Sequence, residues 1–267
     1  MKTYMHDGES GTARRKELIL QELLRVGEVS VDLLAGKLKV STATIRRDLT
    51  VLEGQGLLRR NHGGASPVEP ALYEPFRNVS SFSEQERQRT AEKRRIGLAA
   101  AELVQDGDTI ALGAGTTTTQ IARSIRHRRG LTVLTNAVNI AMELSHRDDI
   151  KIFVTGGYLS VAWFALVGAT AEQNASQMFV DKAFIGVDGI HVEHGLTTNY
   201  PDQAAIHRTL LQQANLRIAV ADHRKIGIAA TALICQPQDI NIFITDKKAA
   251  IGSITQFADK GIRVIRT

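Results

Sequence analysis

Residues 41–49 read Ser-Thr-Ala-Thr-Ile-Arg-Arg-Asp-Leu, and this stretch decides the fold of the first quarter of the chain. If Ser41 caps a helix, Ile45, Leu49 and Leu52 fall on one face of it and can pack against neighbouring helices. The hydroxyl and cationic side chains are then left for the outer face. Taken alone, such a helix could simply have a solvated basic face. Its surroundings decide between that interpretation and a recognition helix in the major groove of DNA.

The surroundings supply the other parts of a winged helix-turn-helix. Apolar residues recur at helical spacing from Ala13 to Val26, Gly27 ends that first helix, and Ser30 can cap a second helix through Leu38. Residues 57–64 then run from an apolar pair through a basic pair into a glycine turn, which is typical of a wing. The predicted fold class of this part is an α+β winged helix-turn-helix domain.

The expected DNA contacts follow from this arrangement. The candidates for base edges in the major groove are Thr44 and Arg46. The candidates for phosphate contacts, helped by the positive end of the helix, are Ser41, Thr42 and Arg47. The wing can enter the adjacent minor groove or hold its phosphates through Arg59, Arg60 and His62. Asp48 is interpreted as the partner of a neighbouring arginine that fixes the helix, and not as a base contact.

Composition narrows the class of protein further. The chain has 267 residues, 43% of them hydrophobic and 23% charged, and a formal net charge of +5, which suits a globular protein with an anionic partner. One cysteine, Cys235, excludes an internal disulfide framework, so a reducing compartment is expected. The first residues lack the apolar core of a signal peptide, and no apolar stretch is long enough to span a bilayer. We therefore expect a soluble cytoplasmic protein without a membrane partner.

A linker is expected after the wing, because Pro67, Pro70 and Pro75 interrupt regular structure there. Ser83 and Glu86 then form a capping box that predicts a long helix through Gln105. The predicted organisation is a DNA-binding domain over residues 1–66, a linker over 67–82 and a second domain over 83–267.

Short apolar runs rich in β-branched residues alternate with helical segments in the second domain. The predicted strands cover residues 109–112, 131–134, 150–154, 183–187, 218–221, 240–245 and 262–265. This alternation predicts an α/β domain with a mainly parallel sheet covered by helices on both faces. In such a sheet the ligand crevice lies beyond the carboxyl ends of the strands.

The loops at these strand ends carry polar residues suited to a phosphorylated, polyhydroxy ligand. Backbone N–H groups, hydroxyls and a helix start can converge on a phosphate at Gly113, Gly115, Thr116, Thr117 and Thr118. Two further strand ends contribute Thr135, Asn136, Gly156 and Gly157. Later segments offer a carboxylate, hydroxyls and a cation from Asp188, Thr197, Thr198 and Lys225. Each motif alone could be ordinary helix capping, a turn or a solvated side chain.

Taken in order, Arg14, Leu18, the run Ser41-x-x-Thr44-Ile45-Arg46-Arg47-Asp48-Leu49 and the second-domain motifs resemble the DeoR-type family of bacterial sugar-operon repressors. The resemblance covers nearly the whole chain. It implies a second domain similar in fold to ribose-5-phosphate isomerase and glucosamine-6-phosphate deaminase. It assigns the phosphate to the Gly-Thr loop and Lys225, and the sugar to the regions of Asp188 and Thr197.

The chain also departs from the common pattern of that family. Gly113 and Ala114 stand where an aspartate and a serine are frequent, and Asp202-Gln203 stands where paired acidic residues are frequent. Both departures leave open which sugar phosphate fits. Residues 161–164, where polar residues are frequent, are interpreted as packing, with an apolar wall beside the ligand as the alternative.

The expected function is that of a transcriptional repressor of a carbohydrate operon, bound to double-stranded operator DNA as a homodimer or tetramer and released by a phosphorylated sugar. The alternatives are a sugar-phosphate isomerase-like enzyme and a DNA-binding protein without an effector. No catalytic residue, cofactor or metal is expected. The histidines at 191, 194, 207 and 223 lack the paired spacing of a metal site, and they are expected at the surface or the pocket rim.

Overall fold

The computed structural model of the chain describes residues 7–55, 57–67 and 81–267. Its contacts divide into two units, Met1–Glu69 and Pro70–Thr267, which are described separately below. The predicted linker falls mainly on residues 68–80, which lie outside the described residues. The predicted domain limits therefore stay predictions.

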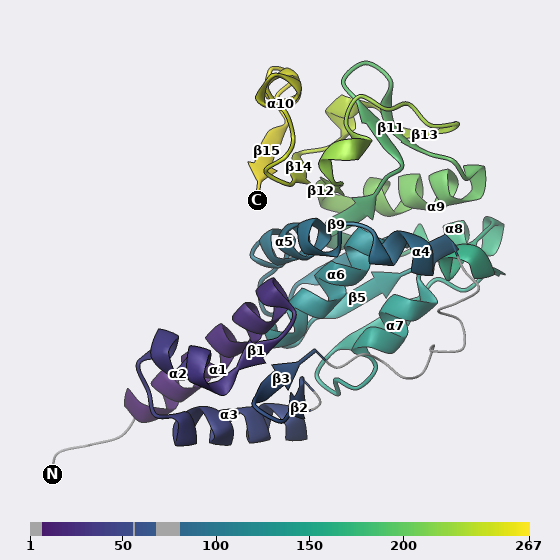
Figure 1. Ribbon diagram of the computed structural model, residues 1–267. Coiled ribbons are helices and arrows are strands. Elements are labelled where there is room, and N and C mark those ends of the chain that lie inside the picture. Colours follow the sequence, from purple (N-terminus) through teal and green to yellow (C-terminus); the bar gives the residue numbers. More distant parts are fainter. Residues whose placement is uncertain (1–6, 56, 68–80) are drawn as a thin grey trace, which may run out of the picture. The chain divides into compact units, whose positions relative to one another are not determined.

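The described residues of the first unit form three helices and a small antiparallel sheet (Figure 1). The helices are α1 (Asp7–Val26), α2 (Val31–Leu38) and α3 (Thr42–Gly54). The strands are β1 (Val29–Ser30), β2 (Arg59–Asn61) and β3 (Gly64–Ser66), in the order β1-β3-β2. The winged helix-turn-helix expectation is confirmed, although α1 begins earlier than the predicted Ala13.

The predicted caps set the helix ends of this unit. The Ser30 hydroxyl accepts a hydrogen bond from the Leu33 amide at 3.2 Å. The Ser41 hydroxyl does the same for the Thr44 amide, also at 3.2 Å. Gly27 ends α1 with a φ of 86°, a left-handed conformation that glycine adopts without strain.

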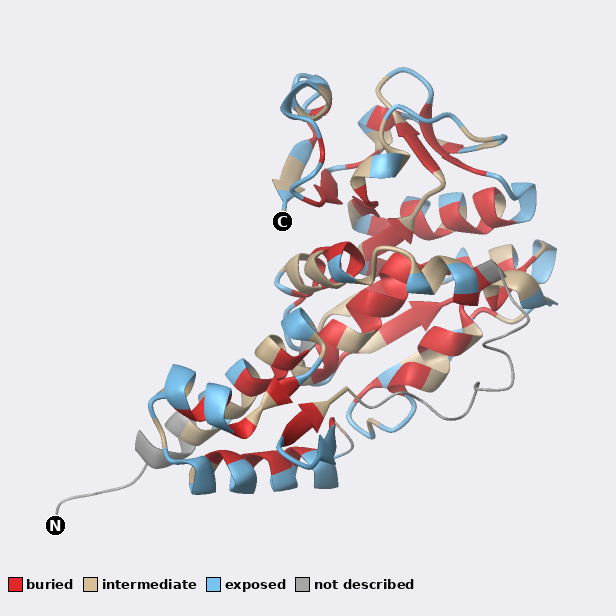
Figure 2. Cartoon of the chain, in the orientation of Figure 1, coloured by how far each residue is buried: buried red, intermediate tan, exposed pale blue. Residues whose placement is uncertain are grey.

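The apolar and polar side chains of α3 lie on opposite faces, as the sequence predicted. Ile45, Leu49 and Leu52 are buried, whereas the outer face of α3 is exposed (Figure 2). Asp48 is also buried, and its carboxylate accepts two hydrogen bonds from the Arg15 guanidinium, at 2.6 and 3.2 Å. The expected arginine partner exists, but it belongs to α1. The pair therefore links α3 to α1.

The second unit is built on a seven-stranded sheet in the order β15-β14-β12-β9-β4-β5-β6, and all of its pairings are parallel. Its strands are β4 (Thr109–Leu112), β5 (Thr132–Thr135), β6 (Lys151–Val154), β9 (Val180–Gly186), β12 (Ala214–Val220), β14 (Ile242–Thr245) and β15 (Arg263–Arg266). The predicted α/β architecture with a mainly parallel sheet is confirmed.

Helices cover both faces of this sheet. They are α4 (Ser81–Arg87), α5 (Thr90–Ala101), α6 (Thr116–Ser124), α7 (Val138–Leu144), α8 (Ala169–Ala175), α9 (Pro201–Gln212) and α10 (Ile251–Ala258). The connections through α6 and α7 run from β4 toward β6, whereas the connection through α9 runs the other way, from β9 to β12. Right-handed crossovers therefore place α6 and α7 on one face and α9 on the other.

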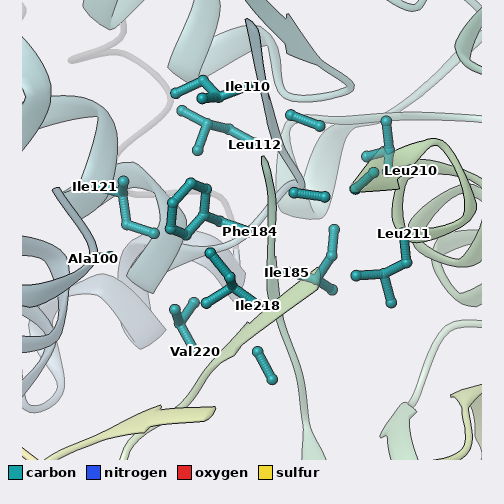
Figure 3. Packing of buried hydrophobic residues seen from close by; sticks show 14 of the residues in the cluster. Ala100, Ile110, Leu112, Ile121, Phe184, Ile185, Leu210, Leu211, Ile218 and Val220 are labelled. Atoms are coloured by element: carbon teal, nitrogen blue, oxygen red, sulfur yellow. The ribbon is translucent and has the colours of Figure 1, made fainter. Parts of the chain in front are cut away.

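Side chains of the central strand β9 pack against helices on both faces of the sheet (Figure 3). On β9, Phe184 points toward Ile121 of α6, and the next residue, Ile185, points toward Leu210 and Leu211 of α9. All of these side chains are buried. Successive residues of a strand face opposite sides, so the run of apolar residues in β9 fills two cores at once.

Short elements that the periodicity did not predict complete the unit. A three-stranded sheet contains β10 (Gly189–His191), β11 (Gly195–Thr198) and β13 (Ala232–Cys235), and a hairpin contains β7 (Tyr158–Ser160) and β8 (Ala165–Val167). The described residues also contain the 3₁₀ turns η2 (Ile125–His127), η3 (Val161–Trp163), η4 (His223–Lys225) and η5 (Pro237–Asp239). None of the helices in the described ranges combines the length and hydropathy that a bilayer span requires.

The single long helix predicted for residues 83–105 is wrong, because two helices occupy that region. The backbone of Arg89 has a φ of 53°, which interrupts the helix between α4 and α5. The Thr90 hydroxyl donates to the carbonyl oxygens of Glu86 and Arg87, whose usual partners lie beyond the break. Periodicity could not reveal the break, since residues 83–90 around it include no apolar side chain.

The pair between Arg15 and Asp48 generates a stability prediction. Asp48→Asn removes the charge from a buried acceptor, and we expect the first unit to lose about 1–3 kcal/mol of unfolding free energy. Hydrogen–deuterium exchange of the full chain should accelerate in peptides of α1 and α3 and stay unchanged in β4 and β9.

The control is Arg25→Gln, which breaks an exposed ion pair with Glu22. Exposed pairs of this kind contribute little, so this variant should exchange like the parent. Equal exchange in Asp48→Asn and the parent would show that the buried pair does not hold α3.

Candidate functional site

The outer face of α3 presents the side chains predicted to contact DNA. Ser41, Thr42, Arg46 and Arg47 are exposed, and Thr44 is half-buried. The hydroxyls of Ser41 and Thr44 also hydrogen-bond each other at 2.9 Å. Ser41 therefore already serves as the helix cap, whereas the two arginines leave their charges on the surface.

The wing adds three exposed residues, Arg59, Arg60 and His62. The Arg60 guanidinium donates to the Thr50 hydroxyl at 2.8 Å, and its backbone amide donates to the Glu53 carboxylate at 2.9 Å. Arg60 thus braces the wing against α3. Within the described part of the chain, no ion pair engages Arg46, Arg47 or Arg59, so these side chains can meet phosphates or bases.

A pocket lies in the second unit where β4, β9 and β12 end. These three neighbouring parallel strands finish at Leu112, Gly186 and Val220. The pocket is lined by Gln85, Lys93, Ala114, Gly115, Thr116, Thr117, Trp163, Gly186, Val187, Asp188, Thr198, Gln203, His207, Ala221, Asp222 and Lys225. Six predicted ligand residues meet here: Gly115, Thr116, Thr117, Asp188, Thr198 and Lys225.

The Gly-Thr loop presents the start of α6 to this pocket. The hydroxyls of Thr118 and Thr119 donate back to the Gly115 carbonyl, at 2.9 and 2.8 Å. These two hydroxyls therefore cap the turn, and Thr118 does not line the pocket. The first amides of the helix have no partner within it, so they are free to face an anion at Thr116 and Thr117.

Two other predicted ligand residues, Thr135 and Asn136, hold the Gly-Thr loop and the end of β4 in place through hydrogen bonds. The Asn136 side chain accepts from the Ala114 amide at 2.9 Å and donates to the Leu166 carbonyl at 3.1 Å. The Thr135 hydroxyl donates to the Leu112 carbonyl at 2.7 Å. Both side chains are fully buried and lie outside the pocket lining.

The remaining predicted residues outside the lining also have structural roles. Gly157 has a φ of 103°, and a Cβ there would lie 2.6 Å from the Val167 carbonyl oxygen; Gly156 precedes it with a φ of 70°. The Thr197 hydroxyl donates to Gly189 and accepts from the Ala230 amide. The Gly113 amide donates to the Phe184 carbonyl at 3.0 Å.

Asp188 connects three segments at the pocket. One carboxylate oxygen accepts from the Thr198 hydroxyl at 2.9 Å and from the Asn199 amide at 3.0 Å. The other oxygen lies 3.3 Å from the Lys225 ammonium. An incoming anion would therefore compete with Asp188 for Lys225.

Lys93 is a second cation in the pocket, and sequence reasoning missed it. It is buried on α5 and donates to the Gln85 carbonyl. Desolvation lowers the pKa of Lys93 to about 8, with Asp222 opposing this shift and the like charge of Lys225 adding to it. A lysine on the apolar face of an amphipathic helix, one turn before Ile96, was the signal available in the sequence.

Trp163, Gln203 and His207 also line the pocket, and none of them was among the predicted ligand residues. Trp163 lines the pocket with its ring 5.4 Å from that of Tyr200, so the apolar wall fits this residue better than plain packing. Phe164 does pack in the interior, edge-on to Phe82 at 5.3 Å. His207 is fully buried and not at the rim, and burial lowers its pKa to about 4.

The structure also gathers His191, Glu193 and His194, whose ligand atoms all lie within 4.8 Å of one another. The sequence shows no paired spacing typical of a metal site, so it did not predict that these three side chains lie close together. The Nδ1 atom of His191 accepts the amides of Glu193 and His194, at 3.1 and 3.3 Å. That nitrogen is therefore already occupied in closing the β10–β11 turn.

Comparison with known proteins identifies both units. A model of the DeoR-like helix-turn-helix domain matches residues 15–71, and a model of the DeoR C terminal sensor domain matches residues 88–247. The chain is 34% identical over 253 residues to the HTH-type transcriptional regulator GlpR of Haloferax volcanii, covering 95% of this chain and 97% of that protein. It is 35% identical over 229 residues to the HTH-type transcriptional repressor GlcR of Bacillus subtilis, covering 86% of each.

Ribose 5-phosphate isomerase A from Neisseria gonorrhoeae is among the solved structures that align with the chain. Its TM-score is 0.36 at 13% identity, over 52% of this chain and 54% of that one. The expected likeness to such isomerases is therefore found, and at this score it carries no argument about function.

The lysine pair predicts how anion affinity depends on pH. An anion at the start of α6 favours protonated Lys93, so affinity should fall as pH rises through the pKa of about 8. Between about pH 7 and pH 9 the fall should reach up to about tenfold. Sulfate is the suitable probe because it does not titrate in this range, and the fluorescence of Trp163, the single tryptophan of the chain, can report its binding.

The control is Lys93→Met, which should bind sulfate more weakly and lose the pH dependence. If the affinity of the parent protein for sulfate stays constant between these two pH values, Lys93 does not face the anion.

Proposed function

The chain belongs to the DeoR family of transcriptional regulators, and on that basis we propose that it represses a carbohydrate operon and leaves its operator when a phosphorylated sugar binds. One observation carries the proposal. The helix start at Gly115–Thr117 and the two lysines Lys93 and Lys225 line one pocket, in a chain whose other unit is a winged helix-turn-helix.

The phosphate end of the ligand is proposed to lie at the start of α6. The free amides there and the two ammonium groups offer charge-assisted hydrogen bonds to a phosphate dianion. Thr135 and Asn136 act on the phosphate indirectly, since they hold the loop in place. Lys225 acts on the buried Lys93 as a like charge, which an anion in the pocket would offset.

The sugar end is proposed to extend toward Asp188 and Thr198. The carboxylate of Asp188 is an acceptor for sugar hydroxyls once Lys225 turns to the phosphate. Gln203 and Trp163 lie in the same lining and can add an amide and an apolar ring face. This arrangement favours a phosphorylated sugar over free phosphate.

The DNA side of the proposal uses α3 in the major groove. Arg46 and Thr44 are placed at base edges, with Thr42, Arg47 and Arg59 at phosphates. Arg60 and Ser41 are proposed to act mainly by holding the wing and the helix cap, because their polar groups are engaged within the unit. His62 extends the wing. Reading of repeated half-sites by a homo-oligomer, a dimer or a tetramer, is part of the proposal.

An isomerase is the second candidate, and we propose that the chain is not an enzyme. Such a reaction needs a carboxylate placed as a base beside the carbon that loses a proton. The Asp188 oxygens are engaged by Thr198, Asn199 and Lys225. The nearby residue 203 is a glutamine, which cannot act as a base. A DNA-binding protein without an effector fits less well, because it has no use for the polar pocket.

An operator-shift assay tests the proposal. The full chain is mixed with DNA from upstream of its own gene and titrated with ribose 5-phosphate, glucose 6-phosphate and fructose 6-phosphate, each beside its free sugar. We expect one phosphorylated sugar to release the DNA and its free sugar to have no effect. Release by no phosphorylated sugar, or equally by a free sugar, would contradict the proposed effector.

Arg46→Ala is the variant that separates DNA reading from DNA affinity. Losing a base contact should reduce discrimination between operator and random DNA by about 1–3 kcal/mol. Arg95→Ala, which changes a cation of the second unit, is the matched control and should bind like the parent. Unchanged discrimination in Arg46→Ala would remove this residue from the reading surface.

A further inference from the structure

Among the residues that the structure describes, two side chains that line the pocket contain buried polar atoms with no protein partner. They are Trp163, through its indole Nε1, and His207, through both ring nitrogens. An unpaired buried polar group costs free energy that a partner would recover. Their common position in one pocket indicates that a ligand supplies the missing partners.

The surroundings of His207 fix its chemical character. It is only 2% exposed, and its pKa of about 4, lowered by burial, keeps the imidazole neutral at physiological pH. Asp188 is the charged group that acts on it, and it opposes the shift. A neutral imidazole has one N–H donor and one nitrogen acceptor, and the indole adds a second donor. This set matches hydroxyl groups, which both donate and accept.

Gly113 makes the position of His207 possible. A Cβ on residue 113 would lie 2.7 Å from the Ile185 side chain and 3.1 Å from Nε2 of His207. The imidazole therefore occupies space that a side chain at 113 would need. Residue 113 directly precedes the Ala114–Thr117 part of the lining, so the imidazole lies beneath the proposed phosphate loop.

A nitrogen of His207 can reach the pocket without a rearrangement of the fold. A half-turn of the ring about the Cβ–Cγ bond exchanges each nitrogen with a carbon atom of similar size. The side chain already lines the pocket, together with Gln203 one helical turn earlier on α9. A bound hydroxyl would favour the orientation in which it is hydrogen-bonded.

We propose that His207 and Trp163 bind the uncharged, hydroxyl-bearing part of the effector, between the phosphate loop and Asp188. The effector class is then a phosphate ester of a neutral sugar or polyol. A phosphorylated sugar acid does not fit, because its carboxylate would lie against a neutral ring and near the Asp188 carboxylate. This inference rests on the proposed function, of which it specifies the ligand.

The test compares His207→Phe with the parent by isothermal titration calorimetry. The probes are ribose 5-phosphate, glucose 6-phosphate, fructose 6-phosphate, the sugar acid 6-phosphogluconate, and sulfate. We expect the tightest neutral sugar phosphate to lose about tenfold or more in affinity, since about one to two hydrogen bonds are removed. Sulfate affinity should stay within about twofold, because the phosphate loop is intact.

A second readout separates binding from a general loss of structure. Replacing unpaired buried nitrogens by carbon should leave the thermal midpoint of the empty protein unchanged or higher. His207→Gln keeps a donor and an acceptor and should recover part of the affinity. His191→Phe changes a histidine outside the pocket lining and should bind every probe like the parent.

The outcomes distinguish this inference from the function on which it rests. If the parent binds none of the sugar phosphates, the proposed function fails, and the inference fails with it. If the parent binds one of them and His207→Phe binds it equally well, only the inference is overturned. Tightest binding of 6-phosphogluconate by the parent would likewise overturn the neutral ligand class alone.

Discussion

The parallel pairing of β9 with both β4 and β12 is the constraint on which the second unit depends. Phe184 of β9 is in register with Leu112 on one side and with Ile218 on the other. Neighbouring parallel strands end at the same edge of a sheet, so the segments that follow them have to meet. The Gly-Thr loop, Asp188 and Lys225 come from distant parts of the sequence and line one pocket for this reason.

The pocket contains charged and polar groups whose electrostatic and hydrogen-bonding needs other protein groups do not fully meet. Lys93 is buried with Lys225 acting on it as a like charge, and, as far as the structure describes the chain, the ring nitrogens of His207 and Trp163 have no protein partner. Asp188 meanwhile holds Lys225. A phosphate ester with free hydroxyls would satisfy these groups together. Binding free energy of that kind can shift the chain from a state that binds DNA to one that does not.

Local signals made the helices of the first unit and the strands of the large sheet predictable, because periodicity and caps such as Ser41 act within a few residues. The sequence also indicated which strand ends carry polar loops. It could not separate residues that line the pocket from those that support it, since Asn136 and Thr116 look equally suitable. Lys93 and His207 were missed because their roles depend on helices folding over the sheet. The break at Arg89 lies in a stretch, residues 83–90, without apolar side chains, so periodicity carried no information there.

We propose that one chain couples the binding of operator DNA to the binding of a phosphorylated sugar. Thermodynamic linkage requires the coupling to be reciprocal, so a ligand that weakens operator binding by some factor must itself bind more weakly, by that factor, to the operator complex. The direct measurement is the affinity of the releasing sugar phosphate for the full chain, alone and saturated with operator. We expect equal factors in the two directions. A sugar-phosphate affinity that operator DNA leaves unchanged would contradict the coupling.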